Sequence, residues 1–368
     1  MRRRGNMRVK CERDQILKGI SFCQGVISTR TTLPILSYVL MKAEKNTLSL
    51  YATDLEVGVE TKIDAEIVEE GSITLPGKKM LELIREFPSG IITLSSENNL
   101  VTIRNENIWI KMISLPQEEF PAFPEVKGRE IKVNGKILKK MIKKTSFSVS
   151  HEETRYMLNG IYTTVFEKLI SMVSTDGRRL SLITQELENI VPTEVEAILP
   201  LKACEQLTKI MEDDEVLIVW GDKQIKFTQP GVSLVTRIIE GEFPDYKSVI
   251  PKSFKGEGHI DKTKFQESIR RAYILTKEKA LSVRLSLQEG KMMISTRVPD
   301  QGESNEEMEI EYSGEAMDIA FDPEYLLDVL RVLDCEKIFF GVNGPEDPAL
   351  IKPIDGESYI YVVMPMKI

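Results

Sequence analysis

The chain has 368 residues, a formal net charge of −8 and a hydrophobic fraction of 42%. This length predicts roughly two to three domains, and the apolar content is ordinary for a folded protein with a buried core. No stretch approaches the roughly 20 apolar residues of a membrane span. The scattered cysteines include no CxxC pair, which argues for a reducing compartment and against a disulfide framework or a zinc site. We therefore expect a cytoplasmic protein.

The first third begins with the basic residues 1–6. No apolar segment follows, so these residues are not a signal peptide. We interpret them as an extension before the first strand, and a DNA-contacting arm is the alternative. The patterns then predict a helix over 13–24, and strands over 7–12, 46–54, 57–63, 91–94, 100–104 and 108–113. Residues 30–36 are expected to lead into a further strand that ends at Met41. The proline-rich residues 119–124 read as a linker.

The middle third repeats this order. A strand near 131–133 precedes a helix over 136–145, and further strands are expected over 158–162, 169–175, 180–185, 216–220, 224–228 and 233–238. The last third has a strand near His259, a helix over 264–275, and strands over 283–287, 291–296, 308–312, 337–342, 349–352 and 359–364. Residues 303–307 are expected to form an acidic loop.

One phrase recurs in all three thirds: a strand end, a proline and an amphipathic helix. Its prolines, Pro76, Pro200 and Pro323, lie 124 and 123 residues apart. Proline cannot continue a strand ladder but suits a first helical turn. The spacing predicts three similar domains over 1–125, 126–252 and 253–368. Each is written as two β-α-β-β-β units of a mixed α+β fold with antiparallel sheets.

No catalytic constellation is evident. The two histidines, His151 and His259, have no nearby cysteine or second histidine, so we expect no metal. Phosphate-loop, GxSxG and HExxH patterns are absent. Asp54 and Asp176 follow threonines at equivalent strand ends. They are better explained as turn-capping residues than as a carboxylate pair. We therefore expect neither catalysis nor a cofactor.

Lysines cover the predicted helix over 136–145, at Lys136, Lys139, Lys140, Lys143 and Lys144. A solvated face is the simplest explanation for one such helix. Basic residues also recur on the corresponding helices of the other repeats. Helices aligned by stacked repeats would form a basic strip that holds duplex DNA through its phosphates without reading sequence. Whether the 136–144 segment contacts DNA directly is left open.

A set of short motifs resembles the beta subunit of bacterial replicative DNA polymerase, the sliding clamp family. They include Thr53-Asp54-Leu55-Glu56, Thr175-Asp176-Gly177-Arg178-Arg179-Leu180, Glu242-Phe243-Pro244-Asp245-Tyr246 and Tyr361-Val362-Val363-Met364-Pro365-Met366, in family order. The resemblance implies the DNA clamp fold: a head-to-tail homodimeric ring with three domains per subunit, helices inside and sheets outside. It also implies a non-catalytic subunit that encircles DNA and tethers the polymerase, the clamp loader and other proteins that carry a clamp-binding motif.

The resemblance further implies a hydrophobic pocket for partner peptides. Its matching residues are Leu158, Thr175, Gly177, Arg179, Leu180, Pro244, Val249, Val362, Met364, Pro365 and Met366. An exposed run of Val, Met and Pro at a chain end is unusual unless something covers it, and Met adapts to varied ligands. A terminal strand buried in its own core is the plainer explanation, and it suits Val363 better than Met364 or Met366.

The residues implied to contact DNA are Arg30, Lys78, Lys79, Tyr156 and Lys202. Ser248 replaces the family's basic residue, which puts a DNA contact there in doubt. The implied dimer interface joins a strand carrying Ile110 to a helix carrying Ile274 and Leu275 of the other subunit, with Glu303, Glu306 and Glu307 nearby.

Two rival hypotheses remain. The first is a monomeric scaffold that binds duplex DNA independently of sequence. It would dissociate from circular DNA at high salt, whereas a closed ring would remain. The second is a nucleic-acid-processing enzyme that uses Asp54 or Asp176. Metal-dependent cleavage lost on Asp176→Asn would support it.

Overall fold

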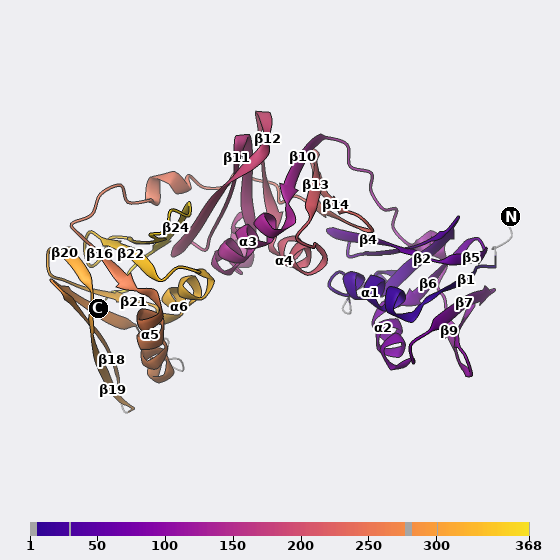
Figure 1. Cartoon of the computed structure of the whole chain (residues 1–368), viewed down its shortest axis with the longest axis horizontal. Coiled ribbons are helices and arrows are strands. Elements are labelled where there is room, and N and C mark those ends of the chain that lie inside the picture. The colour runs from indigo at the N-terminus through magenta and orange to yellow at the C-terminus, as the bar shows by residue number, and fades with distance from the viewer. Residues whose placement is uncertain (1–5, 29–30, 277–281, 300, 368) are drawn as a thin grey trace. The chain divides into compact units, whose positions relative to one another are not determined.

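A computed structural model of the chain describes residues 6–28, 31–276, 282–299 and 301–367. The chain divides into two compact units. The first comprises Met1–Lys139 and Lys202–Ile238, and the second Lys140–Leu201 and Ile239–Ile368. Each unit packs helices on sheets, and the strand pairings among the described residues are antiparallel (Figure 1). The predicted α+β class is therefore confirmed.

The first unit contains two sheets. One has the order β5-β1-β7-β8-β9, and the other β10-β13-β14-β15-β4-β3-β2-β6. Their strands are β1 Arg8–Glu12, β2 Tyr38–Glu44, β3 Thr47–Thr53, β4 Val57–Asp64, β5 Glu66–Glu69, β6 Gly71–Pro76, β7 Ile91–Glu97, β8 Leu100–Asn105, β9 Ile108–Ile113, β10 Arg129–Asn134, β13 Glu215–Trp220, β14 Gln224–Gln229 and β15 Val232–Arg237. The pairing of β15 with β4 joins the first and middle thirds of the chain in one continuous sheet.

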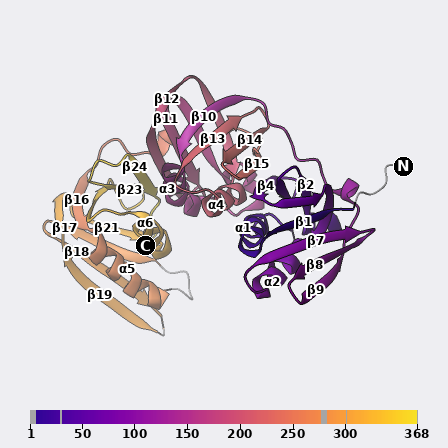
Figure 2. The ribbon, with the colours of Figure 1, turned by 45° about the vertical axis from the view of Figure 1, so that its right-hand side comes forward.

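Helices α1 (Arg13–Gln24) and α2 (Gly77–Glu86) pack against each other in this unit (Figure 2). The buried face of α1 consists of Ile16, Gly19, Ile20 and Cys23, which is the i, i+3, i+4, i+7 spacing of one helical face. It contacts β3 and β4. The helix thus covers one face of the sheet, and its apolar side chains complete the core with those of the strands.

The second unit also contains two sheets. Their orders are β11-β12-β24-β23-β22-β16-β20 and β19-β18-β17-β21. The strands are β11 Gly160–Thr175, β12 Arg179–Pro200, β16 Gly256–Asp261, β17 Val283–Gln288, β18 Lys291–Val298, β19 Gly302–Glu309, β20 Glu311–Gly314, β21 Met317–Phe321, β22 Lys337–Val342, β23 Ala349–Pro353 and β24 Tyr359–Val363. Helices α5 (Lys262–Thr276) and α6 (Pro323–Val332) contact each other in this unit (Figure 1).

Along the chain, the division between the units falls within helix α3 (Gly135–Thr145) and after the first residue of helix α4 (Leu201–Ile210). Short 3-10 helices occur in the connections, at η1 Pro34–Ser37, η2 Gln117–Glu119, η3 Ser146–Ser148, η4 Glu153–Leu158 and η5 Tyr246–Val249. The described part of the chain contains no helix that is both long and apolar enough to cross a membrane.

The element order repeats approximately, as the sequence predicts. Each of the six α-helices in the described part of the chain follows a strand, and the next strand–helix pair comes after three strands (following α2 and α4) or four strands (following α1 and α5). Between α3 and α4 lie the two long strands β11 and β12, of 16 and 22 residues, and β12 itself leads into α4. The recurrent prolines differ slightly from expectation. Pro76 and Pro200 end strands β6 and β12, and only Pro323 begins its helix.

The strand expected to follow residues 30–36 is β2, which begins at Tyr38 after the 3-10 helix η1 and extends to Glu44. One local prediction is wrong. The expected acidic loop over 303–307 is instead strand β19, which pairs along its length with β18. Cross-strand partners offset the poor intrinsic strand preference of glutamate, since Lys291 forms an ion pair with Glu307 at 3.0 Å.

Candidate functional site

The candidate site begins at the tight turn Thr175–Arg179, which joins β11 to β12. The backbone N–H groups of Arg178 and Arg179 donate to Asp176 Oδ1 at 2.9 and 3.0 Å. Thr175 Oγ1 accepts from Gly177 N at 3.0 Å and donates to the Arg179 carbonyl at 2.6 Å. The Asp176 carboxylate therefore caps the turn, as the sequence predicts, and is committed to structure.

A cavity of about 190 Å³ opens beside this turn, within the second unit. We call it the Leu180 pocket. Its walls come from the turn, from the η4 end, from the η5 segment and from the end of β24. The lining residues are Leu158, Thr175, Gly177, Arg178, Arg179, Leu180, Pro244, Asp245, Tyr246, Val249, Val362 and Met364. Most of the surface they offer is apolar, as a pocket for hydrophobic side chains requires.

Buried apolar side chains make the floor of the pocket rigid. Val173, Leu180 and Val362 form a buried cluster on adjacent strands. Half-buried aromatic rings pack against it, and the Phe243 ring stacks on Tyr162 with centroids 4.9 Å apart. Burial raises the pKa of Tyr246, so its hydroxyl stays protonated at neutral pH.

Arg179 holds the wall of the pocket in place. Its side chain is only 11% exposed, and its guanidinium lies over the Tyr325 ring, 4.3 Å from the centroid. It donates to Asp176 at 2.9 Å, to Asp328 at 2.7 Å and to the Phe147 carbonyl at 2.7 Å. Burial works to lower the pKa of Arg179, but Tyr361 and the two carboxylates raise it above its ordinary value. The cation is therefore fully paired and its apolar stem faces the cavity.

The chain end supplies the rim. Met364 is 40% exposed, whereas Val363 before it is fully buried. The Met364 N–H donates to the Arg178 carbonyl at 2.8 Å, which fixes the end of β24 to the turn. A flexible thioether held at the mouth of an apolar cavity can adapt to differently shaped ligands.

The structure brings most of the predicted pocket residues together. Pro365 and Met366 are half-buried and do not line the cavity. Met366 instead bridges to Ala320 through a 2.7 Å backbone hydrogen bond. Sequence reasoning missed Arg178, Asp245 and Tyr246. All three lie next to predicted residues within the same motifs, so the motifs could have been used to predict them.

The predicted DNA contacts differ in their environments. Lys78 and Lys79 are exposed in the first turn of α2 and form no ion pair with a described residue. Tyr156 is 53% exposed on η4. Lys202 is ion-paired with Asp54. Arg30 lies outside the described residues.

The five lysines of α3 do not all lie on a solvated face. Lys144 is buried and pairs with Glu357, which also pairs with Lys140 at 2.7 Å. Lys139 pairs with Asp213. Lys136 and Lys143 are exposed, and Lys136 interacts electrostatically with the same Asp213. The helix therefore carries much less free positive charge than its sequence suggests.

The predicted interface residues lie on exposed edges. Ile110 is half-buried on β9, the edge strand of its sheet, and its neighbours Trp109 and Ile113 are 57% and 67% exposed. Ile274 on α5 is 73% exposed, and Leu275 is half-buried. Two of the nearby acids have intramolecular partners: Glu306 bonds Arg271 and Ser268, and Glu307 pairs with Lys291.

The remaining titratable residues form no metal-binding cluster in the described part of the chain. His259 lies 3.4 Å from Glu311, which also pairs with Lys337. Cys11, Cys23 and Cys204 are buried, and burial raises the pKa of the Cys11 and Cys23 thiols to about 12. Such thiols are poor nucleophiles.

Sequence models of the DNA polymerase III beta subunit match nearly the whole chain. The N-terminal domain model matches residues 7–124, the central domain model 132–245 and the C-terminal domain model 247–367. The beta sliding clamp of Pseudomonas aeruginosa is 31% identical, with 98% of this chain and all of that protein aligned. The beta sliding clamp of Vibrio cholerae is 30% identical over equal coverage.

Solved structures show the same similarity in three dimensions. The DNA polymerase sliding clamp of Bacillus subtilis has a TM-score of 0.95 at 27% identity, covering 99% of this chain and all of that one. A Pseudomonas aeruginosa sliding clamp bound to griselimycin has the same TM-score and coverage at 31% identity. The DNA polymerase III beta subunit of Thermotoga maritima has a TM-score of 0.93 at 28% identity and covers 98% of this chain.

Proposed function

This chain belongs to the DNA polymerase III beta subunit family, the beta sliding clamps, and we propose that it acts as a homodimeric ring which encircles duplex DNA and binds partner peptides in the Leu180 pocket. As a family member it is a non-catalytic processivity factor of DNA replication, and DNA and the polymerase are its partners. The ring, the pocket's ligand, the clamp loader as a further partner and a cytoplasmic location belong to the proposal.

The ring would be built from three similar domains per subunit, over 1–125, 126–252 and 253–368. The threefold order of elements supports these boundaries. Six such domains would place the helices inside and the sheets outside. A closed ring holds the polymerase on DNA by topology, so its lining can interact weakly and slide.

The observation that carries the proposal is the Leu180 pocket, an apolar cavity rimmed by an exposed methionine. Apolar surface of this kind marks a binding site for a protein or ligand. A short peptide with glutamine and leucine or phenylalanine side chains would fit its floor and rim. In this proposal Pro365 and Met366 do not contact the peptide inside the cavity. They support the adjoining Met364 or lie at the outer edge of the Leu180 pocket.

The double variant Leu180→Ala with Met364→Ala tests the pocket. We expect it to abolish binding of a clamp-binding peptide from the polymerase, measured by fluorescence anisotropy, while the dimer persists in ultracentrifugation. Because Leu180 is buried and its truncation can cost about 2–5 kcal/mol, thermal melting must confirm that the variant is folded. Met364→Ala alone, which removes an exposed side chain, should weaken binding in a fully stable protein.

Leu55→Ala with Val68→Ala is the matched control, since both residues are exposed apolar side chains outside the pocket. This control should bind the peptide normally. Unchanged affinity in the Leu180→Ala, Met364→Ala protein would refute the pocket assignment.

The ring itself is tested at the proposed interface of Ile110 with Ile274 and Leu275. Ile274→Glu would bury an unpaired charge there, so we expect monomers in ultracentrifugation. Ile354→Glu is the control, because Ile354 is also an exposed isoleucine in the second unit. A dimer that survives Ile274→Glu would overturn this interface.

The DNA contacts are proposed for Lys78, Lys79 and Tyr156, with Arg30 and Lys202 as further candidates. The free charges of Lys78 and Lys79 are the best placed to bind phosphate, whereas Lys202 would first have to leave Asp54. Replacing both α2 lysines by alanine should reduce the slope of log K against log salt by about 2. An unchanged slope on linear duplex would remove α2 from the DNA-binding surface.

A further inference from the structure

A shallow hollow of about 540 Å³ lies on the solvent-facing side of the sheet that contains β1, β7, β8 and β9. These four strands lie side by side in the first unit (Figure 2). The side chains that alternate with those of the hollow, such as Val9, Leu94 and Ile103, are buried on the opposite face. We call the hollow the Trp109 face. Its lining residues are Arg8, Thr93, Ser95, Thr102, Arg104, Trp109 and Lys111.

The strand register arranges these side chains in two neighbouring rows that cross the sheet. The first row, from β1 to β9, consists of Arg8, Ser95, Thr102 and Lys111. The second row, from β7 to β9, consists of Thr93, Arg104 and Trp109. Short hydroxyl side chains therefore form the middle of the face, and long cationic or aromatic side chains flank them on both sides.

The cations of the Trp109 face are not neutralised within the chain. Arg8, Arg104 and Lys111 form no ion pair with a described residue, and none of the lining residues is acidic. The neighbouring Lys10 differs, because it pairs with Glu66 at 2.9 Å. Three free positive charges thus gather on one face of a chain whose net charge is −8, and such a local field attracts anions.

The other lining groups add contacts that a simple anion would not use. The hydroxyls of Thr93, Ser95 and Thr102 form no hydrogen bond among the residues that the structure describes, so they can donate to a ligand. Trp109 is 57% exposed, and Lys111 Nζ lies 5.6 Å from its ring centroid. An exposed indole beside cations and hydroxyls is a surface on which a planar base can stack.

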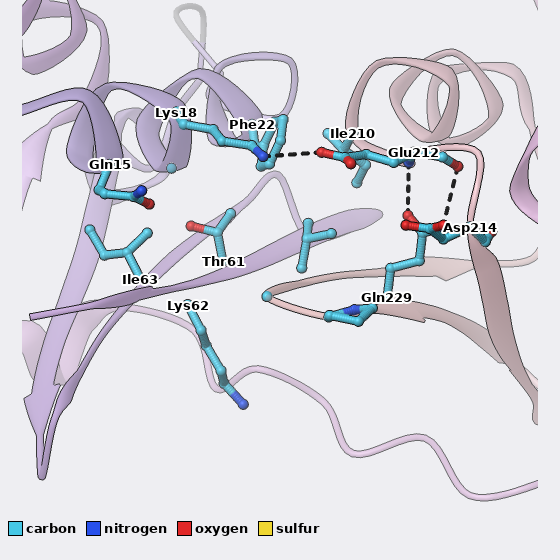
Figure 3. A pocket seen from close by; sticks show the side chains of 14 residues that line it. Gln15, Lys18, Phe22, Thr61, Lys62, Ile63, Ile210, Glu212, Asp214 and Gln229 are labelled. Carbon is cyan, nitrogen blue, oxygen red and sulfur yellow. Dashed lines mark hydrogen bonds and ion pairs between the residues drawn. The ribbon is translucent and has the colours of Figure 1, made fainter.

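A second hollow of the same unit lacks this combination. It lies between α1 and the β14–β15 turn, and Lys18 there pairs with Glu212 at 3.0 Å (Figure 3). Gln229 accepts a hydrogen bond from the Glu212 N–H and donates to the Asp214 carbonyl. The polar groups at its centre therefore bind one another, whereas those of the Trp109 face are free to bind a ligand.

We propose that the Trp109 face binds a short segment of single-stranded nucleic acid. Arg8, Arg104 and Lys111 bind successive phosphates, and one base stacks on Trp109. The cation-bearing strands β1 and β8 are two interstrand steps apart, about 10 Å, which suits a chain of phosphates better than a single anion.

The exposed indole decides between this ligand and other anions. An acidic peptide would satisfy the cations but leave Trp109 without a stacking partner. Duplex DNA offers no unstacked base, so it would also leave the indole unused. The inference rests neither on the ring nor on the Leu180 pocket.

Tryptophan fluorescence reports on this face. The chain has two tryptophans, and Trp220 is only 8% exposed, so a stacked base should quench the emission of Trp109. Titration of the full chain with oligothymidylate at low salt should give a Kd on the order of 100 µM, the weak end of non-specific binding. An abasic strand with the same phosphates should compete at least about fivefold more weakly. Duplex DNA should not quench, and Trp109→Leu should abolish the signal.

A double variant locates the phosphate contacts. Arg104→Gln with Lys111→Gln removes two cations and keeps the tryptophan as reporter. We expect the affinity to fall by at least about tenfold, and the slope of log K against log salt to become shallower by about 1.4, at roughly 0.7 for each contact with a single strand. Thermal melting confirms that the variant is folded.

Lys127→Gln with Lys223→Gln is the matched control. Both are exposed lysines of the first unit that lie outside the Trp109 face and form no ion pair with a described residue. This control loses the same charge, so its affinity should equal that of the unmodified protein.

Several outcomes would rule out the proposal. These are unchanged emission on addition of the oligonucleotide, equal quenching by duplex DNA, and equal loss of affinity in the control and in Arg104→Gln, Lys111→Gln. Stronger quenching by a peptide of residues 302–309, the acidic strand β19, would instead assign the face to a second copy of the chain. Peptide affinity at the Leu180 pocket, measured on the same samples, keeps this result separate from the proposed function.

Discussion

The turns Thr53–Val57 and Thr175–Arg179 are built alike in separate units of the molecule. In both, an aspartate Oδ1 accepts two backbone N–H groups: Asp54 at 3.0 and 2.7 Å, and Asp176 at 2.9 and 3.0 Å. In both, the preceding threonine accepts one N–H and donates to the carbonyl four residues later. A shared local sequence, Thr-Asp, therefore produces the same loop twice.

What surrounds the two turns differs. The second oxygen of Asp54 meets Lys202, an exposed partner, whereas that of Asp176 meets the buried Arg179. The second turn borders the apolar Leu180 pocket. The same turn is thus present at both places, and the residues beside the second one line an apolar cavity.

The largest predicted effect is at Arg179. We expect Arg179→Met to lower the free energy of unfolding by about 3–5 kcal/mol, because it leaves Asp176 and Asp328 without their buried partner. Urea denaturation followed by circular dichroism measures it. Arg178→Met, at the exposed neighbouring position, should change stability by less than about 0.5 kcal/mol. Equal effects of the two variants would mean that Arg179 does not hold the turn.

A smaller effect is expected at Glu357. This carboxylate pairs with the buried Lys144 and with the exposed Lys140, so it combines a buried and an exposed ion pair. Burial works to raise the pKa of Glu357, but the two lysines outweigh it and lower the pKa below its ordinary value. The carboxylate therefore stabilises the fold above its unfolded-state pKa of about 4.3, and this contribution is lost as pH falls through the folded-state pKa.

Glu357→Gln should therefore cost about 2 kcal/mol at pH 7, because Lys144 keeps its burial and loses its counter-charge. The variant should also lose stability less steeply than the unmodified protein on acidification below about pH 5. Unfolding at a series of pH values measures both. Glu346→Gln, an exposed carboxylate without an ion pair among the described residues, is the control. Parallel acid profiles for Glu357→Gln and the unmodified protein would contradict the prediction.

The sequence was sufficient to predict features that depend on near neighbours. The Thr-Asp turns and the repeated strand–proline–helix order follow from local patterns, whereas the pocket residues were implied by the resemblance of the motifs to a family. Features set by distant partners could not be predicted. Lys144 and Glu357 are 213 positions apart, yet their pairing decides that the lysine is buried. Likewise, nothing in the local sequence around Lys202 indicates that this lysine forms an ion pair with Asp54.

The middle positions of the turns should respond in opposite directions to substitution. Leu55 has φ +81° and Gly177 has φ +89°, a region in which a side chain is strained. We expect Gly177→Ala to cost about 1 kcal/mol and Leu55→Gly to stabilise by up to about 1 kcal/mol, since Leu55 is largely exposed. Thermal melting distinguishes them. Two changes of the same sign would show that the turns are not conformationally equivalent.

The smallest effect should be at Lys202. Its ion pair with Asp54 is half-exposed on the lysine side, and exposed pairs contribute about 0–1 kcal/mol. Lys202→Met should therefore destabilise by less than about 1 kcal/mol, and 0.5 M salt should reduce the difference. Denaturation at two salt concentrations tests this. A loss as large as that of Arg179→Met would mean that the first turn depends on its ion pair as much as the second. The turns Thr53–Val57 and Thr175–Arg179 would then differ only in the apolar cavity beside the second one.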